Sequence, residues 1–287
     1  MPLPEISDID RALAAAEAAV PNLRKGCEKR VVWAGEPGVK TPVALLYIHG
    51  FSASPEELRP LPDIIAKELV ANIHFTRLTG HGQDGAAMAT ATYADWRRDV
   101  AEAVEIAQTI GDEIIIMGCS TGCTLGTLAL ADGVPAKAAI FISPNFGLRN
   151  RVAQIVLDAP GVKHWGKYVA GRTRRFDPIN DGHTAYWTTS YPTEAVHPMG
   201  EAVRAVRRAD LSTVTTPAFF CLNEADTVVH PRDARKVAAR WAGPVALDII
   251  TPGPGDDPGG HVMAGDVFSP AQTVPLAGRI SAWLQGV

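Results

Sequence analysis

Short apolar runs alternate with longer segments of helical periodicity along most of the chain. Runs rich in β-branched residues and bounded by turn residues predict buried strands over Arg30 to Trp33, Val43 to Ile48, Asn72 to Leu78, Glu113 to Met117, Ala138 to Ile142, Pro217 to Leu222 and Val245 to Ile250. The stretches between them predict helices over Pro55 to Leu69, Tyr93 to Thr109, Arg232 to Trp241 and Ala271 to Leu284. Strands that alternate with helices in this way form a parallel sheet covered on both faces. The pattern therefore predicts the α/β class, with a mostly parallel central sheet flanked by helices.

Two helix starts have candidate N-cap residues. Ser54 directly precedes the helix expected from Pro55. Closer to the N-terminus, an alanine-rich segment from Ile9 to Val20 is helical in pattern, with Ser7 before it and Asp10 three residues further on. A serine followed by an acidic residue at this spacing is typical of a helix N-terminus, so both segments are expected to begin at their serine caps.

The alternation of strands and helices breaks off between Arg149 and Leu211. This region has no comparable strand pattern, and glycines, prolines and aromatic residues accumulate between its short helical pieces. The aromatic residues are Trp165, Tyr168, Phe176, Tyr186, Trp187 and Tyr191. We therefore expect residues 149–211 to form an insertion in a core made of residues 1–148 and 212–287.

A G-x-S-x-G pentapeptide, Gly118 to Gly122, follows the strand predicted at Glu113 to Met117 and precedes a helix-compatible segment. At a sharp turn from strand to helix, residues without bulk let the helix pass close to the strand and push the central hydroxyl into an open site. The motif predicts Ser120 as a nucleophile. Because three fixed letters also occur by chance, this interpretation depends on partner residues elsewhere in the chain.

A serine hydroxyl needs a base within hydrogen-bonding reach and a third group that orients the base. Asp226 follows the strand that ends at Leu222, and His261 follows the last predicted strand between flexible glycines. The chain order Ser120, Asp226, His261 is the order expected for a nucleophile elbow of this type. The alternatives to Asp226 are Glu224, two residues earlier, and the pair Asp256 and Asp257, close to His261 in sequence.

The tetrahedral intermediate of acyl transfer also needs backbone donors for its oxyanion. One expected donor is the N–H of Thr121, directly after the nucleophile. The second is expected from the turn after the strand Val43 to Ile48, where Phe51 N–H is the candidate and Gly50 lets the backbone approach the site.

The turn His49-Gly50-Phe51, the segment Leu78 to Gly82, the Ser120 elbow, Asp226 and Gly260-His261 together resemble the α/β-hydrolase superfamily, in particular its monoacylglycerol lipase and carboxylesterase branch. The resemblance covers residues 29 to 287. It implies ester hydrolysis through an acyl-enzyme without a cofactor, and a helical lid inserted after the sixth strand, formed here by residues 149–211.

Three departures from the branch concern the substrate rather than the chemistry. Cys119 stands where relatives often carry histidine, asparagine or an aromatic residue, and Cys123 replaces a frequent glycine. The turn at Gly50 is not the HGGG form of some lipases, which disfavours that subgroup. The resulting hypothesis is a serine hydrolase that acts on a small-molecule carboxylic ester. The alternatives are a thioesterase, a C–C bond hydrolase or a peptidase with the same triad, and a ligand-binding member of the fold without turnover.

The charge and the cysteine content argue against a nucleic-acid partner, a disulfide framework and a metal site. The 27 basic and 31 acidic residues give a net charge of -4 without a block of like charges, so nucleic acid is not an expected partner. The four cysteines are too scattered for a disulfide framework, and Cys119 and Cys123 lack the second ligand pair of a zinc site, so free thiols and no metal are expected.

The N-terminus, Met1 to Asp8, lacks the features of a secretory signal. No segment reaches the ~18 apolar residues of a membrane span, so no integral membrane segment and a cytoplasmic location are expected. Residues 149–211 carry ten basic and six acidic residues, a net charge of +4. This charge is compatible with an anionic substrate or a phospholipid surface, and also with an ordinary solvated face, which the absence of a helical stripe of charge favours.

Overall fold

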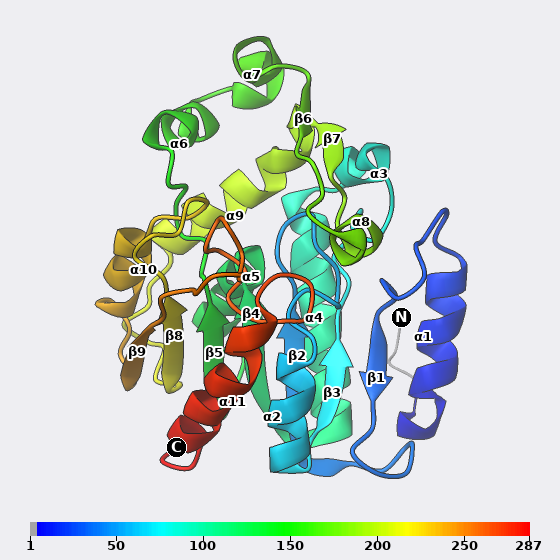
Figure 1. Cartoon of the computed structure of the whole chain (residues 1–287). Helices are drawn as coiled ribbons and strands as arrows, with labels where there is room; N and C mark the ends of the chain where they lie inside the picture. Colours follow the sequence, from blue (N-terminus) through cyan, green and yellow to red (C-terminus); the bar gives the residue numbers. More distant parts are fainter. Residues whose placement is uncertain (1–4) are drawn as a thin grey trace.

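The computed structural model describes residues 5–287 and contains a seven-stranded sheet (Figure 1). Its strands are β1 (Arg30–Val32), β2 (Thr41–Ile48), β3 (Asn72–Phe75), β4 (Gly111–Cys119), β5 (Ala138–Ile142), β8 (Ala218–Leu222) and β9 (Val245–Ile249). They are arranged in the order β1-β3-β2-β4-β5-β8-β9. Only the edge strand β1 pairs antiparallel within this sheet, with β3, so the predicted mostly parallel sheet is confirmed.

Helices cover both faces of the sheet, as the pattern predicted (Figure 1). They are α4 (Tyr93–Ile110), α5 (Thr121–Ala131) and α10 (Pro231–Ala238) on one face, and α2 (Leu61–Leu69) and α11 (Pro270–Leu284) on the other. Side chains along β2 alternate between these layers: Leu46 and Ile48 pack with the first group, and Leu45 and Tyr47 with the second. The continuous apolar run of β2 is therefore buried on both faces, as is usual for parallel strands.

The helix α2 begins later than the sequence pattern predicted. Residues 55–60 form turns, and Pro60 rather than Ser54 occupies the N-cap position. A proline disfavours the helical conformation of the residue before it, which here is Arg59, and this preference acts against a helix that runs from Pro55 through Pro60. This change places Glu57 in a turn instead of a helix.

The N-terminal helix α1 (Ile9–Ala18) follows a short 3₁₀ turn, η1 (Ile6–Asp8). Ser7 lies inside that turn and Asp8 takes the N-cap position, so the predicted Ser7 cap is wrong. Ile9 and Leu13 pack against the edge of the core, which holds α1 beside β1 (Figure 1). Residues 1–4 of the N-terminal segment considered above lie outside the described residues.

Strand β3 is also shorter than predicted and ends at Phe75. Beyond it the chain leaves the sheet, and the backbone N–H of Leu78 donates to Nε2 of His49 at 3.1 Å. The loop then contains α3 (Gly85–Thr90), which packs beside the insertion described next.

A largely helical insertion lies between β5 and β8, above the carboxyl ends of the parallel strands (Figure 1). Its elements are α6 (Arg151–Asp158), α7 (Val162–Ala170), β6 (Thr173–Arg175), α8 (Asp181–Tyr186), β7 (Ser190–Pro192), η2 (Thr193–Val196) and α9 (His197–Arg208). The strands β6 and β7 form a small antiparallel pair that the sequence did not predict. The insertion follows β5, the fifth strand of the described residues, rather than a sixth.

All four cysteines, Cys27, Cys119, Cys123 and Cys221, are buried free thiols. Within residues 5–287, no helix combines the length and the apolar character that a transmembrane helix requires.

Candidate active site

Ser120 lies at the sharp turn between β4 and α5, with φ 51° and ψ −111°. The glycines on either side of it are required by close packing. A Cβ atom at Gly122 would lie 1.9 Å from the carbonyl oxygen of Ile48, and one at Gly118 would lie 2.7 Å from the backbone nitrogen of Cys123. Since real side chains cannot approach so closely, glycine at these positions lets α5 pass directly against the ends of β2 and β4.

The structure brings Ser120, His261 and Asp226 together. Nε2 of His261 lies 3.0 Å from Oγ of Ser120, and Nδ1 of His261 lies 2.7 Å from Oδ2 of Asp226. Only 6% of Ser120, 9% of His261 and 1% of Asp226 is exposed. A carboxylate can only accept, so Nδ1 carries the proton and Nε2 is left free to accept from the Ser120 hydroxyl.

The loop after β8 orients Asp226 toward the histidine. Its second oxygen, Oδ1, accepts the backbone N–H groups of Val228 at 2.7 Å and Val229 at 2.9 Å. Glu224, the first alternative acid, instead forms an ion pair with Arg235 at the surface.

The other two alternative acids also bind away from the His261 ring. Asp257 accepts the backbone N–H groups of His261 at 2.7 Å and Val262 at 2.8 Å, so it holds the histidine loop rather than the ring. Asp256 accepts from Gly253 and Gln272. The position of Asp257 near His261 in the sequence suggested a contact with the ring, whereas Asp257 contacts the backbone of the histidine loop.

The surroundings of His261 shift its pKa in opposite directions. Burial lowers the pKa, whereas the charge of Asp226 and its hydrogen bond raise it, with smaller contributions from Glu57 and Asp257. The net result is a pKa above the ordinary value of 6.5. The raised pKa makes the neutral ring a stronger base toward the Ser120 hydroxyl.

The turn after β2, residues His49 to Ser52 (hereafter the oxyanion turn), lies against the nucleophile. A Cβ atom on Gly50 would be 3.2 Å from Cβ of Ser120. Within residues 5–287, the backbone N–H of Phe51 has no hydrogen-bond acceptor. Thr121 is the first residue of α5, where a backbone N–H has no acceptor within the helix. The N–H groups of Phe51, in the turn beside Ser120, and of Thr121, directly after it, are therefore both free to donate to a ligand.

His49 holds the oxyanion turn as a neutral imidazole. Its Nε2 accepts from Leu78 N–H, so its Nδ1 carries the proton and donates to the carbonyl oxygen of Gly50 at 2.8 Å. Burial lowers the pKa of His49 to about 4, which keeps the ring neutral.

Glu57 is a polar residue of this site that the sequence analysis missed. Its Oε2 accepts the backbone N–H of Gly50 at 2.7 Å and the hydroxyl of Tyr47 at 3.0 Å. Acidic residues are common in the first turn of a helix, so Glu57 in the predicted helix did not indicate a role in the site. The contact is visible only once residues 55–60 are known to form turns.

The insertion packs on two parts of the site. On the oxyanion turn, the ring of Tyr191 lies 5.2 Å from that of Phe51, and Thr188 N–H donates to the carbonyl oxygen of Ser52 at 2.8 Å. On the segment that follows His261, the ring of Trp187 lies 5.0 Å from that of Phe268. Aromatic contacts of this kind stabilise packing beyond the area they bury.

Much of the positive charge of the insertion is paired. The ion pairs are Arg151–Asp233, Lys163–Glu201, Lys167–Glu194, Arg204–Asp158 and Arg207–Asp158. Three exposed arginines at β6, namely Arg172, Arg174 and Arg175, form no ion pair within the described part of the chain. Two further exposed arginines of the insertion, Arg149 and Arg208, also form no ion pair within residues 5–287.

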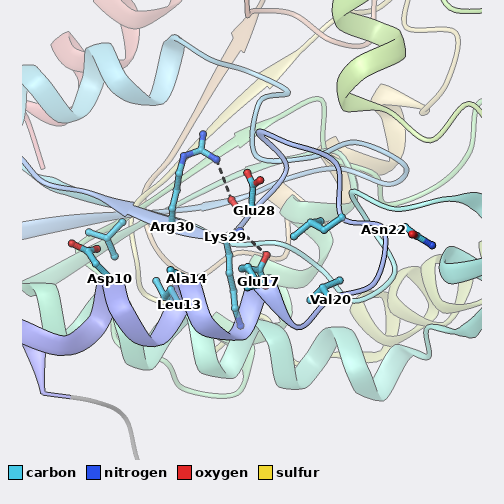
Figure 2. Close-up of a pocket in the computed structure, with 12 residues that line it drawn as sticks. Asp10, Leu13, Ala14, Glu17, Val20, Asn22, Glu28, Lys29 and Arg30 are labelled. Atoms are coloured by element: carbon cyan, nitrogen blue, oxygen red, sulfur yellow. Dashed lines mark hydrogen bonds between the residues drawn. The ribbon is translucent and has the colours of Figure 1, made fainter.

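An open cleft of about 620 Å³ lies between α1 and β1, away from Ser120 (Figure 2). Asp10, Leu13 and Glu17 line it from the helix, and Lys29 and Arg30 line it from the side of β1. None of the residues around Ser120 borders this cleft. The residues that line it include no serine, cysteine or histidine, so it holds no candidate nucleophile with a histidine base.

The chain is similar to a known family and to proteins of known structure. The sequence profile described as the Alpha/beta hydrolase family matches residues 45–275. The thermostable monoacylglycerol lipase of Bacillus sp. (strain H-257) is 29% identical to the chain over 200 residues, which cover 67% of this chain and 74% of the lipase.

Solved structures share the fold at lower identity. One, from the metagenome-derived lipolytic enzymes LipS and LipT, has a TM-score of 0.72 at 19% identity and covers 93% of this chain and 99% of its own. A soluble variant of the monoglyceride lipase of Saccharomyces cerevisiae, in complex with a substrate analogue, has a TM-score of 0.64 at 12% identity and covers 93% and 95%. At these identities the likeness concerns the fold.

Proposed function

The chain belongs to the α/β-hydrolase family and is distantly related to monoacylglycerol lipases and lipolytic esterases, and from this premise we propose that it is a serine hydrolase of carboxylic esters. The observation that carries the proposal is the unbroken hydrogen-bonded series from Ser120 Oγ through His261 to Asp226. Such a series is the arrangement that turns a weak hydroxyl nucleophile into a reactive one.

In the proposed acylation step, Oγ of Ser120 attacks the ester carbonyl carbon while Nε2 of His261 takes the hydroxyl proton. Asp226 stabilises the imidazolium that forms. The backbone N–H groups of Phe51 and Thr121 hold the oxyanion of the tetrahedral intermediate. His261 then returns the proton to the leaving alcohol, the C–O bond breaks, and Ser120 carries the acyl group.

In the proposed deacylation step, a water molecule attacks the acyl-enzyme and gives its proton to His261. The acid is released and His261 protonates Oγ of Ser120, which restores the starting state. Every proton in this cycle moves between Ser120, His261, water and substrate.

We further propose that residues 149–211 act as a lid over a core of residues 1–148 and 212–287. The support is the position of the insertion above the carboxyl ends of the strands and its packing on the oxyanion turn through Tyr191 and Thr188. A lid in this position would determine which acyl and alcohol groups reach Ser120 and would exclude water during the reaction.

The proposal is tested with a fluorophosphonate probe and a series of p-nitrophenyl esters of increasing acyl length. We expect the probe to label Ser120 and at least part of the series to be hydrolysed. Ser120→Ala should abolish both, lowering kcat by at least about 10⁴-fold. Ser212→Ala, which removes an exposed serine hydroxyl, should change neither.

Two outcomes would contradict the proposal. Ester hydrolysis that persists in Ser120→Ala would place the nucleophile elsewhere. A labelled Ser120 with no ester turnover would point instead to a thioester, C–C or peptide substrate for the same triad.

A further inference from the structure

We propose that Glu57 is a positioning residue that holds the oxyanion turn so that the Phe51 N–H points at the reacting carbonyl oxygen. The inference rests on the proposed function, because it assigns a role in the acyl transfer at Ser120. It concerns a carboxyl group that takes no part in the triad.

Glu57 lies directly behind the oxyanion turn and is almost entirely buried, with 3% of the residue exposed. Its Oε2 accepts two hydrogen bonds, from Gly50 N–H at 2.7 Å and from the Tyr47 hydroxyl at 3.0 Å. Tyr47 itself is buried in strand β2. The strand therefore fixes the carboxyl group through Tyr47, and the carboxyl group fixes the turn through Gly50.

Gly50 lies between this carboxyl group and the nucleophile. A Cβ atom on Gly50 would be 2.6 Å from Oε1 of Glu57 and 3.2 Å from Cβ of Ser120. The missing side chain allows the carboxyl group and the nucleophile to approach the same backbone segment closely. A shift of Glu57 would therefore be transmitted to the position of the turn relative to Ser120.

Both polar groups of Gly50 are held, and together they orient the next peptide. Glu57 accepts the Gly50 N–H, and His49 donates to the Gly50 carbonyl oxygen at 2.8 Å. The peptide bond between Gly50 and Phe51 is planar, and in the trans form its C=O and N–H point in opposite directions. Fixing the Gly50 carbonyl and amide therefore fixes the direction of the Phe51 N–H.

A carboxyl group is a costly way to fill this space. Burying it removes its hydration, and an apolar side chain of similar volume would pack without that cost. The groups that face Glu57 are Tyr47 and Gly50 from the strand and turn, Cys119 from β4 and, at longer range, His261. A carboxylate and a carboxylic acid both keep an acceptor oxygen for Gly50, so the positioning role holds in either protonation state.

Two conservative variants separate the reach of the side chain from its charge. Glu57→Asp keeps the charge but withdraws the acceptor by one methylene, and Glu57→Gln keeps an acceptor at the same reach without the charge. We expect Glu57→Asp to lower kcat about 10-fold to 100-fold with KM changed by less than about 2-fold, because only the transition state uses the oxyanion donors. Glu57→Gln should stay within about 3-fold of the wild type.

A trifluoromethyl ketone supplies a second readout, because its adduct with a serine carries an oxyanion. Its inhibition constant should rise in Glu57→Asp by about the same factor as kcat falls, since the inhibitor uses the same donors. The matched control is Glu56→Asp, which shortens the neighbouring acid. Glu56 pairs with Arg30 and Arg59 and makes no contact with Gly50, so both kcat and inhibition should be unchanged.

The inference is overturned if Glu57→Asp hydrolyses esters at the wild-type rate. It is also overturned if Glu57→Gln loses more activity than Glu57→Asp, because the charge of residue 57 rather than its reach would then determine the rate. If Glu57→Asp gives no soluble protein, Tyr47→Phe replaces it. Loss of one anchor of the carboxyl group should then lower kcat about 3-fold at constant KM, and an unchanged kcat would overturn the inference. A wild-type protein that neither hydrolyses esters nor reacts with fluorophosphonate would contradict the proposed function itself, which distinguishes the two failures.

Discussion

The protonation of His261 results from opposing effects within a few ångströms of its ring. Burial favours the neutral imidazole, and Asp226 at 2.7 Å favours the imidazolium, with a net increase of the pKa above 6.5. Only the neutral ring can accept the Ser120 proton. We therefore expect kcat/KM of the wild type to fall as the pH decreases through the His261 pKa.

Asp226→Asn should change both the rate and its pH dependence. The neutral amide no longer raises the His261 pKa, so the acidic limb of the pH profile should move to lower pH. The amide also fails to hold the Nδ1–H tautomer, which should lower kcat about 10⁴-fold. The rate of fluorophosphonate labelling between pH 5 and 9 measures the limb even when turnover is slow.

Glu224→Gln is the matched control for this prediction. It neutralises an acid of the same loop that pairs with Arg235 at the surface rather than with His261. Its labelling rate and pH profile should match those of the wild type. A profile shifted by Glu224→Gln and unchanged by Asp226→Asn would show that the other acid orients the histidine.

At the scale of elements, the elbow depends on the close crossing of α5 over β2. A Cβ atom at Gly122 would lie 1.9 Å from the carbonyl oxygen of Ile48. Gly278 lies in the middle of α11 on its exposed side, and a Cβ atom there would meet no atom within 4 Å. These two helical glycines therefore differ in packing and not in secondary structure.

Alanine at the two positions should have opposite effects. Gly122→Ala forces α5 away from β2 and should destabilise the fold by about 1–3 kcal/mol, with a loss of kcat/KM because Ser120 moves with the helix. Gly278→Ala should stabilise it by up to about 1 kcal/mol through helix propensity alone. Urea unfolding and ester hydrolysis of both variants measure the difference. If Gly122→Ala were as stable as Gly278→Ala, α5 could move away from β2 without a loss of folding free energy.

The starts of the helices show where local patterns mislead. Hydrophobic periodicity predicted helices that end at Leu69 and Leu284, as α2 and α11 do, because each apolar face must pack against the sheet. The predicted caps at Ser7 and Ser54 were wrong, since a preceding 3₁₀ turn and the restriction imposed by Pro60 determined where each helix begins. Helix ends depend on competition between neighbouring turns, which an isolated cap motif does not describe.

At the scale of the whole molecule, a buried ion pair joins α1 to the core. Arg77, in the segment after β3, donates to Glu17 through Nε at 2.6 Å and Nη2 at 2.8 Å, and both side chains are less than one-tenth exposed. Lys29 N–H adds a third bond to Glu17 at 2.9 Å (Figure 2). One carboxylate thus connects α1, the loop before β1 and the segment after β3.

Glu17→Ala should destabilise the protein by about 3–5 kcal/mol, because it leaves the buried charge of Arg77 without a partner. Arg11→Ala on the same helix removes the exposed Arg11–Asp8 pair and should cost less than about 1 kcal/mol. The free energy of unfolding in urea measures both variants. A small effect of Glu17→Ala would mean that water reaches Arg77 and replaces the carboxylate.

The chain by itself determined the layered architecture and the position of the elbow, because hydrophobic periodicity and the steric demands of glycine act within a few residues. Only the tertiary structure decided which acids reach which groups. His261 meets Asp226 across 35 residues and Ser120 across 141, and the same folding takes Asp257 to a backbone contact and Glu57 to Gly50. Hydrogen bonds of this reach depend on how separate loops pack on a common sheet, and no local pattern in the sequence encodes that packing.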